Sequence, residues 1–378
     1  MTDGGGQPYL AGQDPGVSHI TWPVSQRPNR KIPISIGPDR WSALASALDG
    51  EFRDPLFVVI DSSLVKDRPI VPGGISVPDN SVFLVSAGQD RTLEACVLLI
   101  EAAAERGLGE ESAFVGVGGA AVCNVVGLAA SLALRGLPYR LVPTSLMAQL
   151  DAAISPKVGV DAFGLKGAVG SWHPPSSVAI GTDWLSTLSE RHMVSGAAEA
   201  LKHAFVQDTG LVEDVIELKE RGWPVGGAIR TVVERVVRLK LEVLSADRSA
   251  LAPRGVRRGT HFGHAVGRVL DSCSAGSLTH GEAIAHGMVI ECRYAIHLGL
   301  VSSQEGEYVE TSLGRLGALP PLPGDIAPGM VLERLARGGS AIAALPTALG
   351  SGAVSSQHMH LDRLAPVLNG HLARYRST

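Results

Sequence analysis

The spacing of apolar positions changes once along the chain. Between residues 31 and 143, short apolar runs rich in β-branched residues alternate with longer segments in which apolar residues recur every three or four positions. The short runs predict buried strands and the longer segments predict helices. After about residue 182 only the helical spacing continues. The pattern therefore predicts a parallel sheet covered by helices, followed by a helical region.

The position of each expected element can be read from this pattern. Strands are expected at residues 32–36, 56–60, 81–85, 113–117 and 139–142, with helices at 41–48, 92–106 and 122–134. Later helices are expected at 197–206, 212–220, 228–244, 257–271, 282–298 and 304–316. Breaks at 319–328 and 344–356 interrupt the end of the chain, and the second, which carries no charge, is typical of a flexible loop.

The chain is long enough for two domains. Its 378 residues would allow each domain to bury its own core. Residues 1–30 are rich in Gly, Pro, Gln and Asp, which predicts a disordered or irregular arm. We expect an α/β domain with a Rossmann-like parallel sheet at 31–182 and an all-helical domain at 183–378.

Composition narrows the classes of partner. The net charge of −4 gives no surface suited to a polyanion, so nucleic acid is not an expected partner. No uninterrupted apolar run reaches the roughly 18 residues of a membrane-spanning helix. The four cysteines form no Cys-x-x-Cys pair and are expected to be reduced, in a cytoplasmic protein: Cys96, Cys123, Cys273 and Cys292.

A basic stripe is the first candidate site, and its members are Arg257, His261, His264 and Arg268. Their spacings of four, three and four residues would place all of them on one face of a helix. His280 and Glu282 follow, so three histidines and a carboxylate are available for a zinc-type site. The alternative is that the stripe is an ordinary solvated helix face.

A glycine-rich turn lies between the expected strand 113–117 and the following helix. The pattern Gly116-x-Gly118-x-x-Ala121 resembles turns whose backbone N–H groups approach a pyrophosphate at a helix N-terminus. No acidic residue follows about 20 positions later to hold a ribose. The alternative is a tight turn with a purely structural role.

Hydroxyl, carboxylate, lysine and histidine side chains follow the expected strand 139–142. They are Thr144, Ser145, Asp151, Ser155, Lys157, Asp161, Lys166 and His173. Lysines bind phosphate as point charges and a carboxylate accepts from hydroxyls, so the group suits a phosphorylated polyol. A solvated loop with ordinary charges is the alternative.

Glu199 stands in an otherwise apolar helical segment, with Lys202 three residues later on the same face. Burying a carboxylate among apolar residues is costly unless it is paired or bound to a metal. A simple Glu–Lys surface pair is the alternative. Together, Glu199, His264 and His280 would leave open positions on a metal, as catalytic sites do.

Four segments resemble the sugar phosphate cyclase superfamily, whose type member is 3-dehydroquinate synthase. They are residues 134–151, Gly-Ala-Ala-Glu-Ala-Leu-Lys at 196–202, His-Phe-Gly-His at 261–264 and Leu-Thr-His-Gly-Glu-Ala at 278–283. The resemblance covers roughly residues 55–320. It implies an NAD-binding α/β domain, a helical metal-binding domain, a cleft between them and a homodimer.

The resemblance also implies roles for individual residues. The metal ligands, for zinc or cobalt, would be Glu199, His264 and His280. The NAD contacts would be Asp61, Gly118, Gly119, Asn124, Thr144, Ser145, Asp151, Lys166 and Thr187. The substrate contacts would be Asp151, Lys157, Lys166, Lys202 and Arg257. The catalytic residues would be Lys157, Lys202, His261 and Arg268.

The chemistry implied is cyclisation of a phosphorylated sugar. NAD oxidises a secondary alcohol, phosphate is eliminated, the cofactor returns its hydride, and an intramolecular aldol step closes a carbocycle. The chain departs from dehydroquinate synthase at His261, which replaces Asn, and at Arg268, which replaces His. Asn124 and Ser155-x-Lys157 resemble the 2-deoxy-scyllo-inosose synthases, which favours glucose 6-phosphate and secondary metabolism. His261 and Arg268 match neither those enzymes nor the relatives that cyclise sedoheptulose 7-phosphate, so the subfamily stays open.

Three alternatives stay open at the level of sequence. One is 3-dehydroquinate synthase of the shikimate pathway. A second is a metal-dependent polyol dehydrogenase, against which the lysines and Arg257 argue because they favour a phosphorylated substrate. The third is a non-catalytic paralogue, suggested by the altered pocket residues.

Overall fold

The computed structural model describes residues 16–23, 31–49, 55–64, 82–86, 91–163, 165–224, 226–246, 261–337 and 342–377. A seven-stranded sheet occupies its first half, in the order β1-β2-β9-β6-β5-β3-β4. The strands are β1 (Ser18–Pro23), β2 (Lys31–Gly37), β3 (Leu56–Asp61), β4 (Val82–Val85), β5 (Ala113–Gly118), β6 (Tyr139–Pro143) and β9 (Ser177–Gly181). Only β1 and β2 pair antiparallel among these strands. The parallel sheet expected from the alternating pattern is confirmed.

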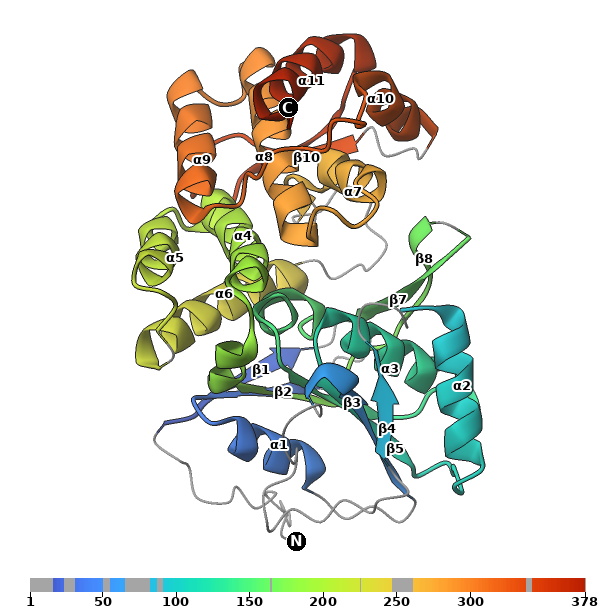
Figure 1. Ribbon diagram of the computed structural model, residues 1–378. Coiled ribbons are helices and arrows are strands. Elements are labelled where there is room, and N and C mark those ends of the chain that lie inside the picture. The colour runs from blue at the N-terminus through green and yellow to red at the C-terminus, as the bar shows by residue number, and fades with distance from the viewer. Residues whose placement is uncertain are drawn as a thin grey trace, which may run out of the picture.

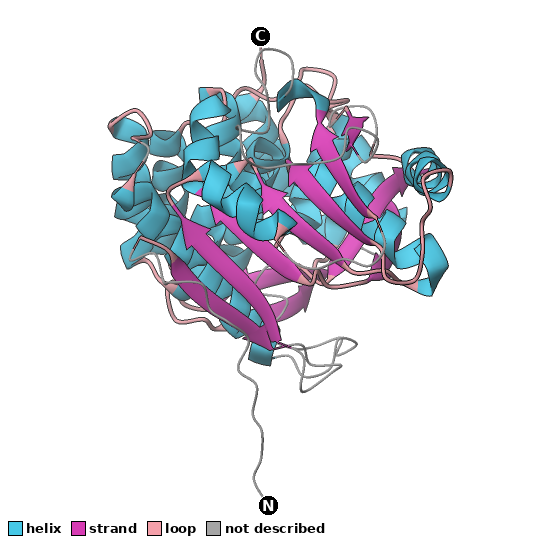
Figure 2. Cartoon of the chain, turned by 90° about the horizontal axis from the view of Figure 1, so that it is seen from below, coloured by secondary structure: helices cyan, strands magenta, loops and turns pink. Residues whose placement is uncertain are grey.

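Helices cover both faces of the sheet, as Figure 2 shows. Within β3, Val58 and Ile60 pack in the cluster under α1 (Arg40–Leu48), whereas Phe57 and Val59 pack in the cluster that includes α3 (Ala120–Leu132). The helix α2 (Leu93–Ala104) lies beside α3. Successive side chains of a strand point to opposite faces, so a continuous apolar run such as β3 requires helices on both sides.

The second half is mainly helical, as expected. Its helices are α4 (Glu190–Gln207), α5 (Gly210–Glu220), α6 (Gly227–Ala246), α7 (His264–Cys273), α8 (His280–His297), α9 (Ser303–Leu316), α10 (Pro328–Arg337) and α11 (Leu361–Tyr375). Buried along nearly its whole length, α8 contacts α4, α7, α9 and α11. Figure 1 shows the sheet and α1 to α3 at one end of the molecule and α7 to α11 at the other.

Four parts of the structure differ from the sequence prediction. The strand β1 lies within the arm expected to be irregular, where it pairs with β2. Residues 344–356 were expected to form a flexible loop, but β10 (Ile342–Pro346) and β11 (Val354–His358) form an antiparallel hairpin there. A second hairpin, β7 (Lys157–Ala162) with β8 (Leu165–Trp172), and the strand β9 were not predicted. These strands are short or rich in small and polar residues, so their pattern is weak.

The helix expected at 257–271 begins only at His264. Gly263, the residue before α7, has φ +79°, a left-handed conformation that a right-handed α-helix does not contain. The helix α7 therefore cannot extend back past Gly263. Residues 247–260, and with them Arg257, lie outside the described residues. The prediction that His261 and His264 share one face of a helix is therefore wrong, because the chain turns between them.

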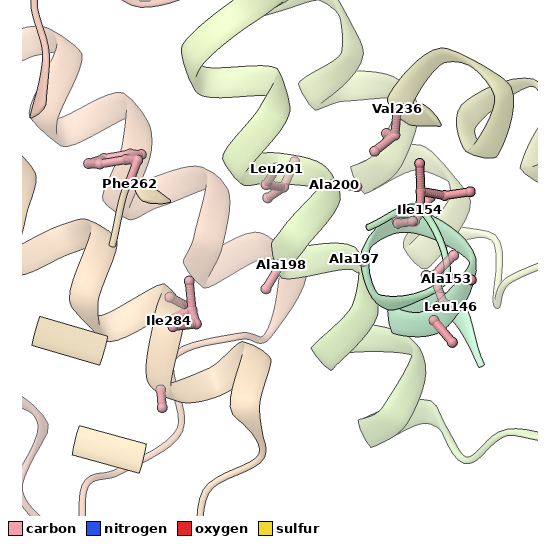
Figure 3. Packing of buried hydrophobic residues seen from close by; sticks show 14 of the residues in the cluster. Leu146, Ala153, Ile154, Ala197, Ala198, Ala200, Leu201, Val236, Phe262 and Ile284 are labelled. Carbon is pink, nitrogen blue, oxygen red and sulfur yellow. The ribbon is translucent and has the colours of Figure 1, made fainter. Parts of the chain in front are cut away.

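The two halves meet in a continuous apolar core. Figure 3 shows Leu146, Ala153 and Ile154 from the segment around the π-helical turn η4 (Ala148–Ala152) facing α4 and α6. A Cβ at Gly196 of α4 would lie 2.6 Å from the Cβ of Leu146, so close packing here depends on glycine. This contact fixes where α4 stands relative to the ends of the strands. Within the described residues, no helix is long and apolar enough to cross a membrane.

Candidate active site

The carboxyl ends of the central strands meet at one edge of the sheet. The N–H of Thr144, just after β6, donates to the carbonyl of Gly118 at the end of β5 over 2.9 Å. The buried Gln149 amide donates to the carbonyls of Pro143 and Gly181, over 3.2 and 3.1 Å, and so ties the ends of β6 and β9. In open parallel sheets, ligands bind at such carboxyl edges.

Gly118 and Gly119 form a tight turn into α3. A Cβ on Gly118 would lie 2.6 Å from Cγ2 of Val122 and 3.2 Å from Cβ of Asp61, so no larger residue fits. Gly119 is the N-cap residue of α3 and offers no side-chain acceptor to the first N–H groups of the helix. Ser145 lies opposite, with its Oγ 3.4 Å from the position of a Cβ on Gly119. The turn thus leaves backbone donors available for a ligand.

Two predicted cofactor contacts have side chains occupied elsewhere. The Asn124 amide donates to the carbonyl of Ala120 over 2.8 Å, and its Oδ1 accepts from the N–H of Gly159 over 2.9 Å. It therefore joins α3 to the β7–β8 hairpin. Thr187 ends the short helix η5 (Thr182–Thr187) that follows β9, and its hydroxyl donates to the carbonyl of Trp184 over 2.7 Å.

Glu199, His264 and His280 come together from three helices, α4, α7 and α8. One ligand atom from each lies within 4.8 Å of the other two. Oε1 of Glu199 is 3.5 Å from Nε2 of His264 and 3.9 Å from Nε2 of His280. These distances are longer than a good hydrogen bond, but they suit three ligand atoms that surround one cation.

The contacts around these three residues favour a cation. Nδ1 of His264 lies 3.2 Å from the carbonyl of Phe262, and Nδ1 of His280 lies 3.1 Å from Oδ2 of Asp271. A proton on each Nδ1 leaves both Nε2 lone pairs facing Glu199. Oε1 of Glu199 is buried without a hydrogen-bond donor. A buried carboxylate oxygen without a donor is costly, and a bound cation would satisfy it. The residues present therefore fit a divalent metal.

Burial keeps the neighbouring imidazoles neutral. Burial and the charge of Lys202 hold the pKa of His264 well below its usual range. Burial, followed by the charge of Arg268, lowers the pKa of His261 to about 3. The ring centroids of these two histidines are 5.8 Å apart. Both histidines are thus uncharged at neutral pH, which is the form that binds a metal or accepts a proton.

Two ion pairs involve or adjoin the metal ligands: Lys202 with Glu199 is buried on both sides, whereas in Lys240 with Asp151 only the lysine is buried and the Asp151 side chain is 39% exposed. Lys202, only 1% exposed, donates to Oε2 of Glu199. Lys240 of α6 donates to the Asp151 carbonyl over 2.5 Å and to its Oδ1 over 2.6 Å. Burial opposes ionisation of Asp151, but Lys240 and Lys202 outweigh it and hold the pKa of this carboxyl well below its usual range. The Asp151 carboxyl is therefore ionised at neutral pH.

Three further predicted cations, Lys157, Lys166 and Arg268, lie within the described residues. Nζ of Lys157 lies 5.2 Å from the centroid of the Trp172 ring. Arg268 is exposed on α7, one turn after His264. Nζ of Lys166 lies 2.6 Å from Oδ1 of Asp271, so this lysine is bound to the helical half.

Three polar residues singled out in the sequence have structural contacts instead. Asp161 accepts from the N–H of Gly167 over 2.7 Å within the hairpin. His173 stacks on Tyr139 with ring centroids 5.4 Å apart. Glu282 caps the N-terminus of α8 with Thr279 and pairs with Arg191, so it is not part of the metal cluster.

Two residues of this site were not predicted. Lys240 interrupts the apolar face of α6 next to Val236, Val237 and Leu241, and a lysine in such a face is a sign of a buried partner. Asp271 follows His264 by seven residues on the same helix, which places both on one face. Both positions could have been found from helical spacing.

Comparisons with known proteins cover most of the chain. Residues 81–195 match the model of the 3-dehydroquinate synthase N-terminal family, and residues 196–336 match that of the 3-dehydroquinate synthase C-terminal family. A 3-dehydroquinate synthase of Symbiobacterium thermophilum is 36% identical over 253 residues, 65% of this chain and 68% of that protein. One from Microcystis aeruginosa is 31% identical over 295 residues, 75% and 78% of the two chains.

Solved structures give the same fold. A 2-epi-5-epi-valiolone synthase from Streptomyces hygroscopicus subsp. jinggangensis, with NAD+ and Zn2+ bound, superposes with a TM-score of 0.77 at 25% identity, over 93% of this chain and 100% of that one. A 2-deoxy-scyllo-inosose synthase complexed with carbaglucose-6-phosphate, NAD+ and Co2+ gives 0.75 at 23% identity, over 93% and 99%.

Proposed function

The chain belongs to the sugar phosphate cyclase superfamily, with 3-dehydroquinate synthase as its type member, and we propose that it is an NAD- and metal-dependent cyclase of a phosphorylated sugar. The observation that carries this proposal is the convergence of Glu199, His264 and His280 beside the carboxyl edge of the sheet. A dinucleotide and a divalent cation would then act on the same substrate in the space between the two halves.

Glu199, His264 and His280 would hold the metal. The supporting observation is the buried Oε1 of Glu199, which has no hydrogen-bond donor while two imidazole lone pairs face it. Similar proteins hold Zn2+ or Co2+, and this donor set suits either ion. When bound, such an ion supplies Lewis acidity toward a substrate hydroxyl or carbonyl oxygen.

The strand ends would hold NAD. Its contacts are proposed to be Asp61, Gly118, Gly119, Thr144, Ser145, Asp151 and Thr187. The tight Gly118–Gly119 turn, whose helix N-terminus has no side-chain cap, supports a pyrophosphate here. Thr187 stays in the set because its hydroxyl, which donates to Trp184, can still accept a hydrogen bond. We leave Asn124 and Lys166 out because their side chains bind Ala120, Gly159 and Asp271. Bound NAD supplies reversible hydride acceptance, without net consumption over the cycle.

Cations of this region would bind phosphate and hydroxyl groups of the substrate. Lys157 and Lys202 are proposed substrate contacts, with Asp151 accepting from a hydroxyl. Arg257, which lies outside the described residues, stays a proposed contact, and Lys166 is left out because it pairs with Asp271. Because its pKa is held near 3, His261 is neutral at pH 7 and cannot donate a proton as an imidazolium. Arg268 keeps its charge and cannot shuttle a proton. Proton transfer therefore falls to the neutral His261 as acceptor or to the leaving phosphate itself.

For the substrate, we propose glucose 6-phosphate, converted to a carbocycle as by 2-deoxy-scyllo-inosose synthases. The support is the Asn124 and Ser155-x-Lys157 pattern, whereas His261 and Arg268 depart from the 2-deoxy-scyllo-inosose synthases as well as from dehydroquinate synthase. The second candidate is 3-dehydroquinate synthesis, which the names of the similar sequences favour.

The test is turnover with three substrates. Purified protein loaded with Zn2+ or Co2+ and NAD+ is incubated with glucose 6-phosphate, sedoheptulose 7-phosphate or the phosphorylated dehydroquinate precursor. Phosphate release without accumulation of NADH is expected from one of them. Stoichiometric NADH without phosphate release would show a polyol dehydrogenase instead. Absence of both products, with no retained divalent ion, would show a non-catalytic paralogue.

A further inference from the structure

One carboxylate joins the two halves of the molecule beside the metal ligands. Asp271 of α7 is 4% exposed. Its Oδ2 lies 3.1 Å from Nδ1 of His280, and its Oδ1 lies 2.6 Å from Nζ of Lys166. His280 belongs to the start of α8 and Lys166 to the β7–β8 hairpin. Both oxygens of Asp271 are therefore engaged, each by a different half of the chain.

The first contact orients His280. A ring N–H at Nδ1 that donates to a carboxylate leaves the Nε2 lone pair free and fixes the plane of the ring. In this plane Nε2 of His280 lies 3.9 Å from Oε1 of Glu199. The His280 side chain is 40% exposed, so packing alone holds it less firmly than His264, which is 9% exposed. His280 thus depends on Asp271 for its direction.

The second contact ties down the hairpin. Lys166 lies close to the turn between β7 and β8, next to Gly167, whose φ of +61° makes the tight geometry possible. Figure 1 shows this hairpin projecting from the sheet toward α7. The lysine side chain is 53% exposed, whereas the carboxylate it meets is 5% exposed. The ion pair therefore fixes the projecting β7–β8 hairpin to a buried carboxylate of the helical half.

We propose that Asp271 is a positioning residue that couples the β7–β8 hairpin to the metal site. The proposal rests on the metal site proposed above. Lys166 neutralises the buried carboxylate and holds it in place, and the carboxylate in turn holds His280. Because coupling between two contacts is reciprocal, occupation of the metal site stabilises the seated hairpin by the same free energy with which the hairpin favours metal binding.

The test compares affinities for Zn2+. Each purified full-length variant competes with a chromogenic chelator for the ion. Asp271→Ala is expected to raise the dissociation constant about 10- to 100-fold, the usual cost of losing such a partner. Asp271→Asn keeps an acceptor for His280 but loses the charge, so a smaller loss is expected. Lys166→Met is expected to weaken binding by less than Asp271→Ala, and Lys31→Met, an exposed lysine of β2, is the matched control without effect.

Two further readouts separate positioning from a general loss of stability. Since Lys166 acts through Asp271, the double variant Lys166→Met/Asp271→Ala is expected to bind Zn2+ no more weakly than Asp271→Ala alone. In the Co2+-loaded protein, both Asp271 variants are expected to change the visible absorption bands of the ion, which report ligand geometry. Asp271→Asn serves for the comparison if Asp271→Ala fails to fold.

The outcomes distinguish this proposal from the function on which it rests. Wild-type protein that holds no divalent ion would overturn both. Wild-type protein that holds one, with unchanged affinity and spectrum in the Asp271 variants, would overturn the positioning role alone. Additive losses in the double variant would overturn the coupling to the hairpin.

Discussion

At the scale of single residues, the site depends on buried charges that are balanced before any ligand binds. Glu199 pairs with Lys202, and Asp151 pairs with Lys240. Removing one member of a buried pair is strongly unfavourable because it leaves the other charge without a partner. Because the pairs balance, an added divalent cation leaves the cluster positive. A positive cluster favours a phosphorylated substrate over a neutral polyol.

Glu199→Ala is expected to abolish metal retention while the first domain stays folded. The substitution removes the only carboxylate of the three-ligand cluster. The measurement is elemental analysis of the purified protein after gel filtration, with NAD+ binding as the check on folding. Glu199→Gln is the matched variant of nearly the same volume and should behave alike. Unchanged metal content in both would refute the ligand assignment.

Acid is expected to destabilise the protein partly through His286. This imidazole of α8 is fully buried, and its Nδ1 lies 2.9 Å from Nε2 of His371. Burial lowers the pKa of His286 from 6.5 to about 4. Since the unfolded chain takes up a proton near pH 6.5 and the folded chain does not, the stabilising effect is complete above that pH and declines below it. Between pH 7.5 and pH 5, His286 is expected to lower the free energy of unfolding by about 2 kcal/mol.

The measurement is urea unfolding at both pH values. His286→Gln should lose less stability than wild type over this range, by about 2 kcal/mol. His297→Gln, which changes an exposed histidine of the same helix, should lose as much as wild type. Equal losses in all three proteins would contradict the assignment.

At the scale of elements, glycines set the distances between the helices that carry the ligands. A Cβ on Gly287 of α8 would lie 2.0 Å from the carbonyl oxygen of Gly263, and one on Gly281 would lie 2.0 Å from the carbonyl oxygen of Ser195. The first contact joins α8 to the turn before His264, and the second joins it to α4. The three ligands converge because these helices touch backbone to backbone.

Gly287→Ala is expected to destabilise the protein by about 3 kcal/mol or more, since no flexible side chain can yield at a backbone contact. It should also weaken metal binding because Gly263 precedes His264. Gly314→Ala is the matched control. A Cβ at this position in α9 meets no atom within 4 Å, so a stabilisation of about 0.5 to 1 kcal/mol is expected. Similar urea midpoints for the two variants would contradict this account.

At the scale of the whole molecule, the two halves carry different ligands on a shared core. The apolar cluster is continuous from the sheet through α4 to α8, so the halves are firmly joined at this contact. Salt bridges of Lys240 with Asp151 and of Lys166 with Asp271 also join the sheet half to α6 and α7. NAD is proposed to bind at the sheet edge and the metal among the helices. Each ligand should therefore stabilise the fold separately.

NAD+ at 100 times its dissociation constant should raise the free energy of unfolding by about 2.7 kcal/mol, in wild type and in Glu199→Gln alike. Zn2+ should stabilise only the wild type. The measurement is urea unfolding with each ligand in turn. Stabilisation of Glu199→Gln by Zn2+ as great as that of wild type would place the metal elsewhere, and no effect of NAD+ on either protein would refute the proposed dinucleotide site.

Much of the fold follows from local patterns that the sequence carries by itself. The run Leu56–Asp61 is apolar on both faces, and such a run is stable only within a covered parallel sheet. The helices α4 to α9 follow from their apolar spacing. Of the site, Glu199 stands out as a carboxylate in an apolar segment, and His264 and His280 stand in recognisable motifs. These features are local, so a single sequence determines them.

The tertiary structure decided what depends on distant contacts. The left-handed turn at Gly263 is set by α8 against it, so the expected helix through His261 does not form. Lys166 and Asp271 are 105 residues apart in the chain, and Asp151 and Lys240 are 89 apart. No spacing rule connects such partners, because only the packed core brings them together. The tertiary structure is therefore what brings Glu199, His264 and His280 and the charged residues around them into one site.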